Sequence, residues 1–150
     1  MYEIHIPYPD NKPKLRANSA GNEIFCIIRK KWLKSTPEEW VRQNFLLYLI
    51  EVLQYPASLI AVEKMIELGE LTKRFDILVY NQQHQPHIIV ECKSMQIPLS
   101  EEVLNQALRY YSVVQTKYVV ITNGPSSFLF IREENNLIPT INIPEFESLR

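Results

Sequence analysis

Residues 75–93 have the sequence FDILVYNQQHQPHIIVECK, and this stretch decides the fold. It contains two short runs rich in β-branched and aromatic residues, at 75–80 and 87–92, which are typical of β-strands. The residues between them are polar and end in Pro86, which cannot donate to a strand ladder. The stretch therefore predicts two antiparallel strands joined as a β-hairpin.

The simplest register of this hairpin pairs Tyr80 with His87, and therefore Asp76 with Glu91. Directly opposed residues share a face of the sheet, with Cβ atoms about 4.5–5.5 Å apart. Because side chains alternate along a strand, Lys93 falls on the same face as Glu91 and Cys92 on the other. The sequence thus predicts two carboxylates and one ammonium group at the end of an otherwise apolar hairpin.

Two carboxylates this close repel each other unless a positive charge neutralises them. Magnesium prefers oxygen ligands and needs no histidine or cysteine side chain. A bound Mg²⁺ would polarise a phosphoryl oxygen and activate a water molecule, while Lys93 would orient that water and offset the charge on the phosphate. The predicted reaction is phosphodiester hydrolysis. The competing interpretation is that Lys93 is a surface partner of Glu91 or Asp76 and that the acidic pair is merely solvated.

The composition is that of one ordinary globular domain, with 46% hydrophobic and 22% charged residues in 150. The apolar stretch at 45–50 is too short to span a bilayer, and the N-terminus lacks a signal-peptide core. We therefore expect a soluble, cytoplasmic protein without membrane contact. Cys26 and Cys92 lie in apolar runs, which favours buried thiols over a disulfide or zinc site, and the three histidines have no metal-ligand spacing.

The formal net charge of −1 counts against holding duplex DNA by overall charge alone. Two local basic runs nevertheless stand out, Arg29-Lys30-Lys31 and Lys73-Arg74. The first is either a solvated loop or a nucleic-acid contact. The second lies next to Asp76 and is therefore of greater interest.

Helix-capping residues, and residues that end helices or strands, predict the remaining elements. Residues 1–22 lack periodicity and are expected to form an arm, apart from a short strand at 2–6. A helix is expected from an N-cap at Thr36, with Glu39 completing a capping box, to about residue 54, and a second from Ser100 to about residue 115. Glu39 and Glu51 are the candidates for an additional acidic residue near the metal. Further strands are expected at 59–65, 118–122, 128–132 and 137–143.

The strand at 118–122 should lie parallel to the strand at 87–92, because a crossover helix joins them. The expected fold class is therefore α/β, with a mixed central sheet of about four to five strands flanked by helices. The order of strand, hairpin, Glu-x-Lys, helix and strand resembles the restriction-endonuclease-like core of the PD-(D/E)XK nuclease superfamily, although Phe75 stands in place of the proline of that motif.

Within this superfamily the chain is similar to the N-terminal nuclease domain of type I restriction enzyme R subunits. The resembling segments are residues 36–43, 73–80, 89–93, 106–110 and 118–124. The resemblance implies that Asp76 and Glu91 bind Mg²⁺, with Mn²⁺ as a substitute and with help from the Cys92 carbonyl. It also implies that Lys93 is the catalytic lysine.

Four further residues are expected to contact nucleic acid or support the site. Gln106 and Tyr110 match a QxxxY motif that follows the catalytic lysine in such nucleases, and their spacing places them on one helix face. Arg74 and Arg42 lie within two of the resembling segments. The competing interpretation of the QxxxY motif is an ordinary amphipathic helix.

The implied function is that of a Mg²⁺-dependent endonuclease acting on DNA in restriction–modification. We expect a single domain over residues 1–150, with a core at about 25–125, an N-terminal arm at 1–22 and C-terminal strands at 126–150. Type I R subunits carry a motor after this domain, for which 150 residues leave no room, so the expected assembly is a homodimer or a complex with a separate motor or specificity subunit. The alternatives are a catalytically weak or inactive nuclease-fold module that binds nucleic acid or a protein partner, and a purely structural subunit.

Overall fold

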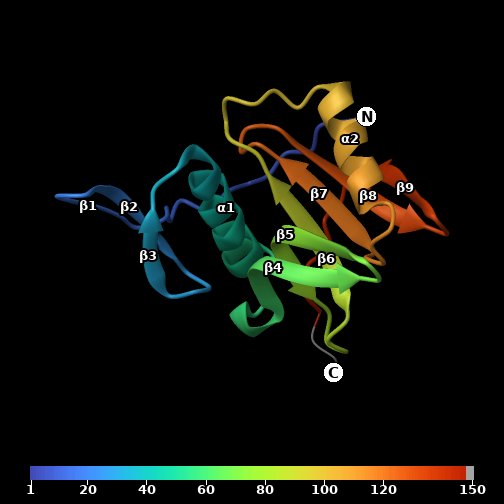
Figure 1. Ribbon diagram of the computed structural model, residues 1–150, viewed down its shortest axis with the longest axis horizontal. Helices are drawn as coiled ribbons and strands as arrows, with labels where there is room; N and C mark the ends of the chain where they lie inside the picture. Colours follow the sequence, from blue (N-terminus) through green and yellow to red (C-terminus); the bar gives the residue numbers. More distant parts are fainter. Residues whose placement is uncertain (148–150) are drawn as a thin grey trace.

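A mixed six-stranded sheet forms the centre of the protein (Figure 1). The computed structural model describes residues 1–147, so the last three residues of the expected C-terminal segment lie outside the described part. The strands are adjacent in chain order: β4 Ile60–Leu68, β5 Leu71–Tyr80, β6 Pro86–Cys92, β7 Tyr118–Thr122, β8 Ser127–Glu133 and β9 Asn136–Thr140. The mixed α/β class is confirmed, but the expected four to five strands are too few.

The parallel pairing of β6 with β7 is confirmed, with Ile88 opposite Tyr118 and Cys92 opposite Thr122. All other neighbouring strands in the sheet run antiparallel. The connection between β6 and β7 contains helix α2, Glu101–Tyr111, whose N-cap Ser100 accepts a hydrogen bond from the Val103 amide at 3.3 Å. This crossover brings the end of β6 beside the end of β7 and sets α2 over the sheet.

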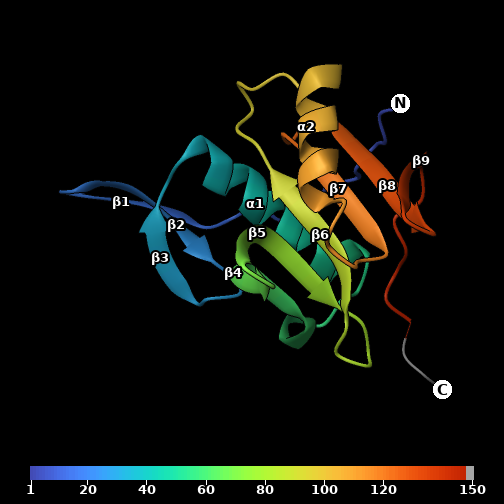
Figure 2. The same ribbon diagram turned by 45° about the vertical axis from the view of Figure 1, so that its right-hand side comes forward.

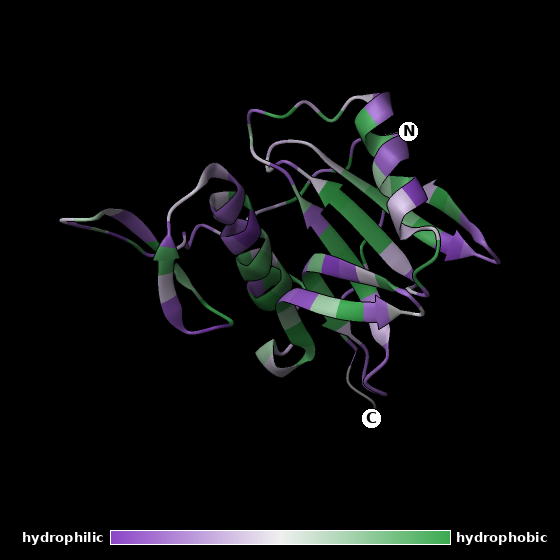
Figure 3. Cartoon of the chain, viewed as in Figure 1, coloured by the Kyte–Doolittle hydropathy of each residue, from purple (hydrophilic) through white to green (hydrophobic). Residues whose placement is uncertain are grey.

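Helix α1, Pro37–Leu47, begins as expected at Thr36, whose hydroxyl accepts from the Glu39 amide at 3.1 Å. It continues as a π-helical turn, η1 Tyr48–Val52, and a short 3-10 turn, η2 Ala57–Leu59, leads into β4. The expected end before Pro56 is thus correct, whereas the π-helical turn was not expected. Figure 3 shows a hydrophilic first half of α1 and a hydrophobic second half, which is the half that packs on the sheet.

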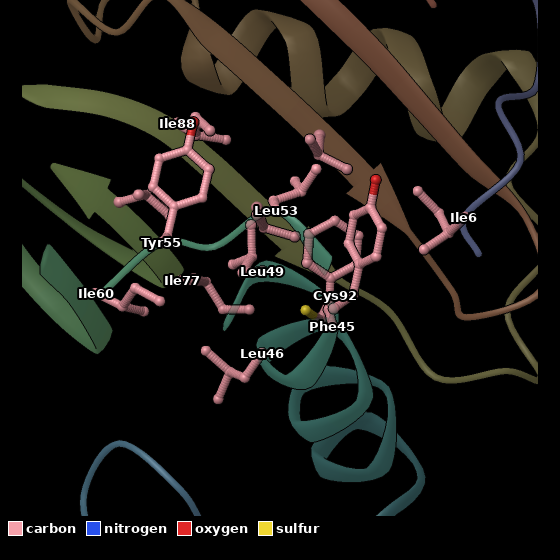
Figure 4. Packing of buried hydrophobic residues seen from close by; sticks show 14 of the residues in the cluster. Ile6, Phe45, Leu46, Leu49, Leu53, Tyr55, Ile60, Ile77, Ile88 and Cys92 are labelled. Atoms are coloured by element: carbon pink, nitrogen blue, oxygen red, sulfur yellow. The ribbon is translucent and has the colours of Figure 1, made fainter. Parts of the chain in front are cut away.

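The two helices cover opposite faces of the sheet, and each face has its own apolar core (Figure 2). On the α1 face, Phe45 and Leu49 pack against Ile77, Ile88 and other apolar residues (Figure 4). On the α2 face, Leu104 and Tyr111 pack with Phe75 and Ile89. Because both faces are covered, β6 is buried along most of its length, which explains its continuous apolar run Ile88-Ile89-Val90.

A second, three-stranded antiparallel sheet precedes α1 and was not expected; only its first strand and the start of its second lie within residues 1–22, where the sequence predicted an arm. Its strands are β1 Leu15–Asn18, β2 Gly21–Cys26 and β3 Lys31–Lys34, and it stands beside α1 on the side away from α2 (Figure 1). The strand expected at 2–6 is absent from the described structure, although Ile4 and Ile6 are buried and the Ile4 amide donates to the Ser127 carbonyl at 2.8 Å. The N-terminal segment is therefore partly a core element.

The hairpin of β5 and β6 has the expected register at its centre, where Ile77 pairs with Val90 and Val79 with Ile88. A bulge at Val79 and Tyr80 shifts the end near the turn, so that Tyr80 pairs with Pro86 and not with His87. The expected pairing at that end is therefore wrong, but the register next to Asp76 is correct. None of the helices in residues 1–147 is long and apolar enough to cross a membrane.

Candidate active site

The expected acidic pair lies at the ends of β5 and β6, just beyond the last ladder pair of Ile77 and Val90. The Cys92 amide donates to Oδ2 of Asp76 at 2.8 Å. The position of Cys92 is itself fixed from the other side, because β6 continues its parallel ladder with β7 to Thr122 and the Lys93 amide donates to the Thr122 carbonyl at 2.8 Å. The Asp76 carboxylate is thereby held next to the backbone between Glu91 and Lys93.

Asp76 and Glu91 reach this strand end in different ways. Asp76 contacts α1, because Nη2 of Arg42 lies 3.1 Å from its Oδ1. Glu91 contacts α2, because the Tyr111 hydroxyl donates to its Oε1. The sequence predicted that the two carboxylates lie on one face of the sheet. In the structure the Asp76 side chain instead turns toward β6, where it accepts a hydrogen bond from the Cys92 amide. Its carboxylate and that of Glu91 lie within electrostatic reach of the same neighbours, Cys92 and Glu38.

Lys93 lies beside Glu91, with Nζ 3.4 Å from Oε2, and its side chain is 37% exposed. The alternation along β6 is as expected, because Cys92 is buried in the core on the α1 face. Burial raises the pKa of the Cys92 thiol well above its usual value. Since that thiol stays protonated inside the core, only the backbone carbonyl of Cys92 is a candidate metal ligand.

Tyr111, and not the neighbouring Tyr110, is the tyrosine in contact with Glu91. Tyr111 follows Leu104 and Ala107 on the buried face of α2, whereas Tyr110 is 38% exposed. The Tyr110 ring instead lies 3.4 Å from Nζ of Lys73. Burial and then the negative charge of Glu91 raise the pKa of Tyr111, so its hydroxyl remains protonated and available as a donor.

The outer side of the site is an open cavity of about 330 Å³ between the sheet and α2. It is lined by Arg74, Glu91, Lys93, Ile97, Val103, Gln106, Ala107 and Tyr110. The structure therefore brings Gln106, Tyr110 and Arg74 to the same cavity as Glu91 and Lys93. The cavity gives a ligand access to both charged groups from solvent.

Arg42 is a supporting residue and not a surface contact, since its side chain is 4% exposed. Its guanidinium lies 2.6 Å from Glu39 Oε1 and 3.1 Å from Asp76 Oδ1. Glu39 also accepts from Gln43 at 3.0 Å, so its carboxylate is used for ion pairing within α1 and not for a reciprocal cap on Thr36. Arg42 thereby fixes the rotation of α1 relative to Asp76.

Glu63 lies beside the site with its backbone in a left-handed conformation. It lies opposite Asp76 in β4, between the ladder pairs Val62–Ile77 and Lys64–Phe75, and its φ of +50° is in the left-handed region. Its carboxylate contacts Arg29, Arg42 and Arg74 at 2.9, 3.5 and 3.3 Å. Burial opposes its ionisation, but the three guanidinium groups outweigh that effect and hold the pKa of Glu63 below its usual value.

The acidic residue of α1 that faces the site is Glu38, which the sequence did not single out. Burial and then the charge of Asp76 raise the pKa of Glu38, with Glu91 adding to the effect and Arg42 and Lys93 opposing it. Neither expected candidate has this position, because Glu39 pairs with Arg42 and Glu51 accepts from Asn11 at 3.1 Å. The available signal was the i, i+4 spacing of Glu38 and Arg42, whose charged atoms lie 3.9 Å apart.

The donor set suits a hard divalent cation. Glu38, Asp76, Glu91 and the Cys92 carbonyl are all oxygen donors, the type that magnesium prefers. Within residues 1–147, no three side chains of His, Cys, Asp and Glu already form a metal cage. Asp76, Glu91 and the backbone carbonyl of Cys92 are the candidate oxygen ligands at this strand end.

These observations define a mixed α/β protein in which two carboxylates and a lysine gather at the carboxyl end of β6, below a crossover helix. Comparison with protein families places it more closely. The family described as type I restriction enzyme R protein N terminus (HSDR_N) matches residues 37–144, which include both helices and the whole six-stranded sheet. The chain belongs to this family, and its membership links the protein to restriction–modification. A comparison with curated proteins finds no match.

Proposed function

We propose that this protein is a Mg²⁺-dependent endonuclease that hydrolyses phosphodiester bonds in DNA. The proposal depends on one observation above all: the Asp76 carboxylate is fixed 2.8 Å from the Cys92 amide, between a glutamate and a lysine that form an ion pair at an open cavity. Membership of the restriction R-subunit family supports the same function.

The residues divide into three roles under this proposal. Asp76, Glu91 and the Cys92 carbonyl hold the cation, which when bound would polarise the scissile phosphate and lower the pKa of a water molecule. Lys93 is the catalytic residue that orients the water and offsets negative charge on the phosphate. Tyr111 and Arg42 are positioning residues, because each donates to one of the two carboxylates and reaches no substrate itself.

Cleavage of DNA by the purified protein tests the proposal, with single-stranded and duplex substrates and added Mg²⁺ or Mn²⁺. We expect cleavage that requires the metal and falls at least about a hundredfold in Asp76→Ala and Lys93→Ala. Lys117→Ala is the matched control, because Lys117 is exposed and precedes the opposite end of β7. Activity that survives in Lys93→Ala, or that is lost equally in the control, contradicts the residue assignment.

Calorimetry with Mn²⁺ separates binding of the metal from catalysis. We expect Glu91→Ala and Asp76→Ala to lose Mn²⁺ binding, whereas Lys93→Ala should retain it because the lysine competes with a cation for the Glu91 carboxylate. Far-UV circular dichroism of each variant establishes that the fold is intact. A wild-type protein that binds no Mn²⁺ contradicts the metal site itself.

The second candidate is a catalytically weak or inactive module of the same family that binds nucleic acid or a protein partner. The contact of Arg42 with Asp76 favours it, because a guanidinium already neutralises one of the two carboxylates. Such a module binds DNA without cutting it. In either case we propose a partner that supplies DNA translocation or specificity, or a second copy of the chain, because R subunits of the family act with other subunits and DNA.

A further inference from the structure

Positive charge is concentrated in the small sheet that precedes α1. Seven of the sixteen Lys and Arg residues lie between residues 12 and 34, together with only one of the seventeen acidic residues, Glu23. This segment therefore has a formal charge of +6, although the chain as a whole has −1. A basic segment within a slightly acidic chain is the electrostatic pattern expected of a surface that binds a polyanion.

One face of this sheet combines the cations with aromatic rings. The pairing sets Arg16 opposite Glu23, Glu23 opposite Lys34 and Phe25 opposite Trp32, whereas the buried Ile24 and Cys26 belong to the other face. Lys14 joins the first face, because the Phe25 amide donates to its carbonyl at 3.0 Å. We call this face, made of Lys14, Arg16, Glu23, Phe25, Trp32 and Lys34, the basic aromatic face.

Two cations on this face lie over aromatic rings, and the rings meet edge to face. The Arg16 guanidinium lies 4.2 Å from the centre of the Trp32 ring, and Nζ of Lys14 lies 5.9 Å from that of Phe25. Phe25 and Trp32 also contact each other, with ring centres 5.4 Å apart. Planar groups with positive charges around them are the arrangement on which unpaired bases stack while the phosphates contact lysine and arginine.

A small hollow beside Phe25 extends this surface. It has a volume of about 120 Å³ and is lined by Asn11, Lys12, Pro13, Lys14, Phe25, Ile27, Gln43 and Leu47. It thus combines two lysines with apolar and aromatic walls. A base with its phosphate matches this chemistry better than an apolar peptide side chain does, because the lysines lie at the same hollow as the ring.

The sheet is connected directly to the candidate active site. Strand β3 ends at Lys34, and α1 begins at Pro37, so Glu38 follows the sheet by four residues. Arg29, in the turn between β2 and β3, contacts both Glu39 and Glu63 beside the site. Nucleic acid held on the sheet is therefore next to the segment that contributes to the site.

We propose that the basic aromatic face binds single-stranded nucleic acid, with bases stacked on Trp32 and Phe25 and phosphates on Lys14, Arg16 and Lys34. The choice of DNA as the strand rests on the proposed nuclease function, but the binding itself requires no catalysis. The face lies before residues 37–144, which match the family. It would therefore hold an unpaired strand outside the segment that matches the family.

Fluorescence anisotropy with a labelled 20-nucleotide oligo(dT) tests this inference, in EDTA so that no cleavage occurs. The triple variant Lys14→Gln, Arg16→Gln, Lys34→Gln should bind at least tenfold more weakly. It should also reduce the slope of log affinity against log salt by about 2, at about 0.7 for each phosphate that is no longer neutralised. The matched control is Lys64→Gln, Arg109→Gln, Lys117→Gln, which removes three exposed charges elsewhere. The control should change the slope by much less.

Trp32→Ala should weaken binding about fivefold or more without changing the salt slope, because it removes stacking and not charge. Trp32→Phe should restore most of the affinity and shows that a folded sheet without the indole still binds. Three outcomes would overturn the inference. The two triple variants could lose affinity equally, or a matched duplex could bind more tightly than the single strand. The wild-type protein could also bind no oligonucleotide and instead bind a protein through this face.

The two proposals fail in different ways. A wild-type protein that binds oligo(dT) through this face but cuts no DNA with added Mg²⁺ or Mn²⁺ establishes the binding face and overturns only the nuclease assignment. A protein that cuts DNA while the triple variant binds and cuts as well as the wild type overturns the binding face and leaves the nuclease assignment intact.

Discussion

The Tyr111 hydroxyl donates a hydrogen bond to Glu91, so removing it measures how much this hydrogen bond contributes to the site. Tyr111→Phe deletes the donor to Glu91 while leaving the ring packed against Phe75, whose ring centre is 6.0 Å away. A hydrogen bond to a charged group contributes about 1.5–3 kcal/mol, so we expect DNA cleavage to fall about tenfold or more. Mn²⁺ affinity measured by calorimetry should fall with it.

Tyr110→Phe is the control for that prediction. Its hydroxyl belongs to an exposed ring that contacts Lys73, and the substitution should keep activity within about twofold because the ring face remains. If Tyr110→Phe impairs cleavage as much as Tyr111→Phe, the assignment of Tyr111 as the positioning residue is wrong.

At this scale the sequence correctly predicted which strand ends carry Asp76 and Glu91, and that these ends are neighbours. Asp76 and Glu91 could be brought together because apolar alternation along two short strands fixes their register. The sequence did not distinguish Tyr111 from Tyr110 or Glu38 from Glu39, because each pair consists of adjacent residues of the same type. Which member of such a pair faces the site depends on how the helix rotates against the sheet, and that rotation is set by packing.

Among the elements, α1 contributes the buried cation on which the site depends. Arg42→Met removes the guanidinium that Glu39 and Asp76 share, and leaves Glu39 with its longer contact to Arg29 at 3.4 Å. Breaking a buried ion pair by removing one partner costs about 3–5 kcal/mol, so we expect the free energy of unfolding in urea to fall by about 3 kcal/mol.

Arg109→Met makes the same chemical change on an exposed position of α2, with an expected loss below about 1 kcal/mol. A small effect of Arg42→Met, no larger than that of Arg109→Met, would show that the ion pairs around α1 contribute little to stability.

The π-helical turn after α1 and the sheet before it have no sequence signal as clear as the N-cap of α1. Strand β1 is exposed at every residue, so it shows no alternation of apolar and polar positions that a prediction could detect.

For the whole molecule, the C-terminal segment closes the core at the end away from the candidate site. The Tyr55 hydroxyl donates to the Pro144 carbonyl at 2.8 Å, and the Phe146 amide donates to the Leu53 carbonyl at 2.8 Å. Burial raises the pKa of Tyr55 to about 12, with smaller contributions from Tyr118, Glu147 and Tyr48. A raised tyrosine pKa means that the unfolded chain loses its proton first as the pH rises.

Stability from Tyr55 should therefore be complete below about pH 10 and be lost as the pH rises from about 10 to 12, a loss of about 3 kcal/mol. Tyr55→Phe should make this alkaline decrease in the free energy of unfolding shallower, measured by urea denaturation at several pH values. Tyr2→Phe, at an exposed tyrosine, is the control and should leave the slope unchanged. Identical slopes for all three proteins would contradict the buried position of Tyr55.

The single parallel pairing in the sheet also orders the events of folding. Contacts within the β5–β6 hairpin join residues about a dozen positions apart, whereas Ile88 meets Tyr118 only after a loop of thirty residues has closed, and Arg42 meets Asp76 across thirty-four. Because short loops close first, the acidic hairpin forms before its stabilising neighbours arrive. We therefore expect the hairpin to form while Asp76 still lacks its contact with Arg42, so divalent cations in the refolding buffer should speed the approach to the native state.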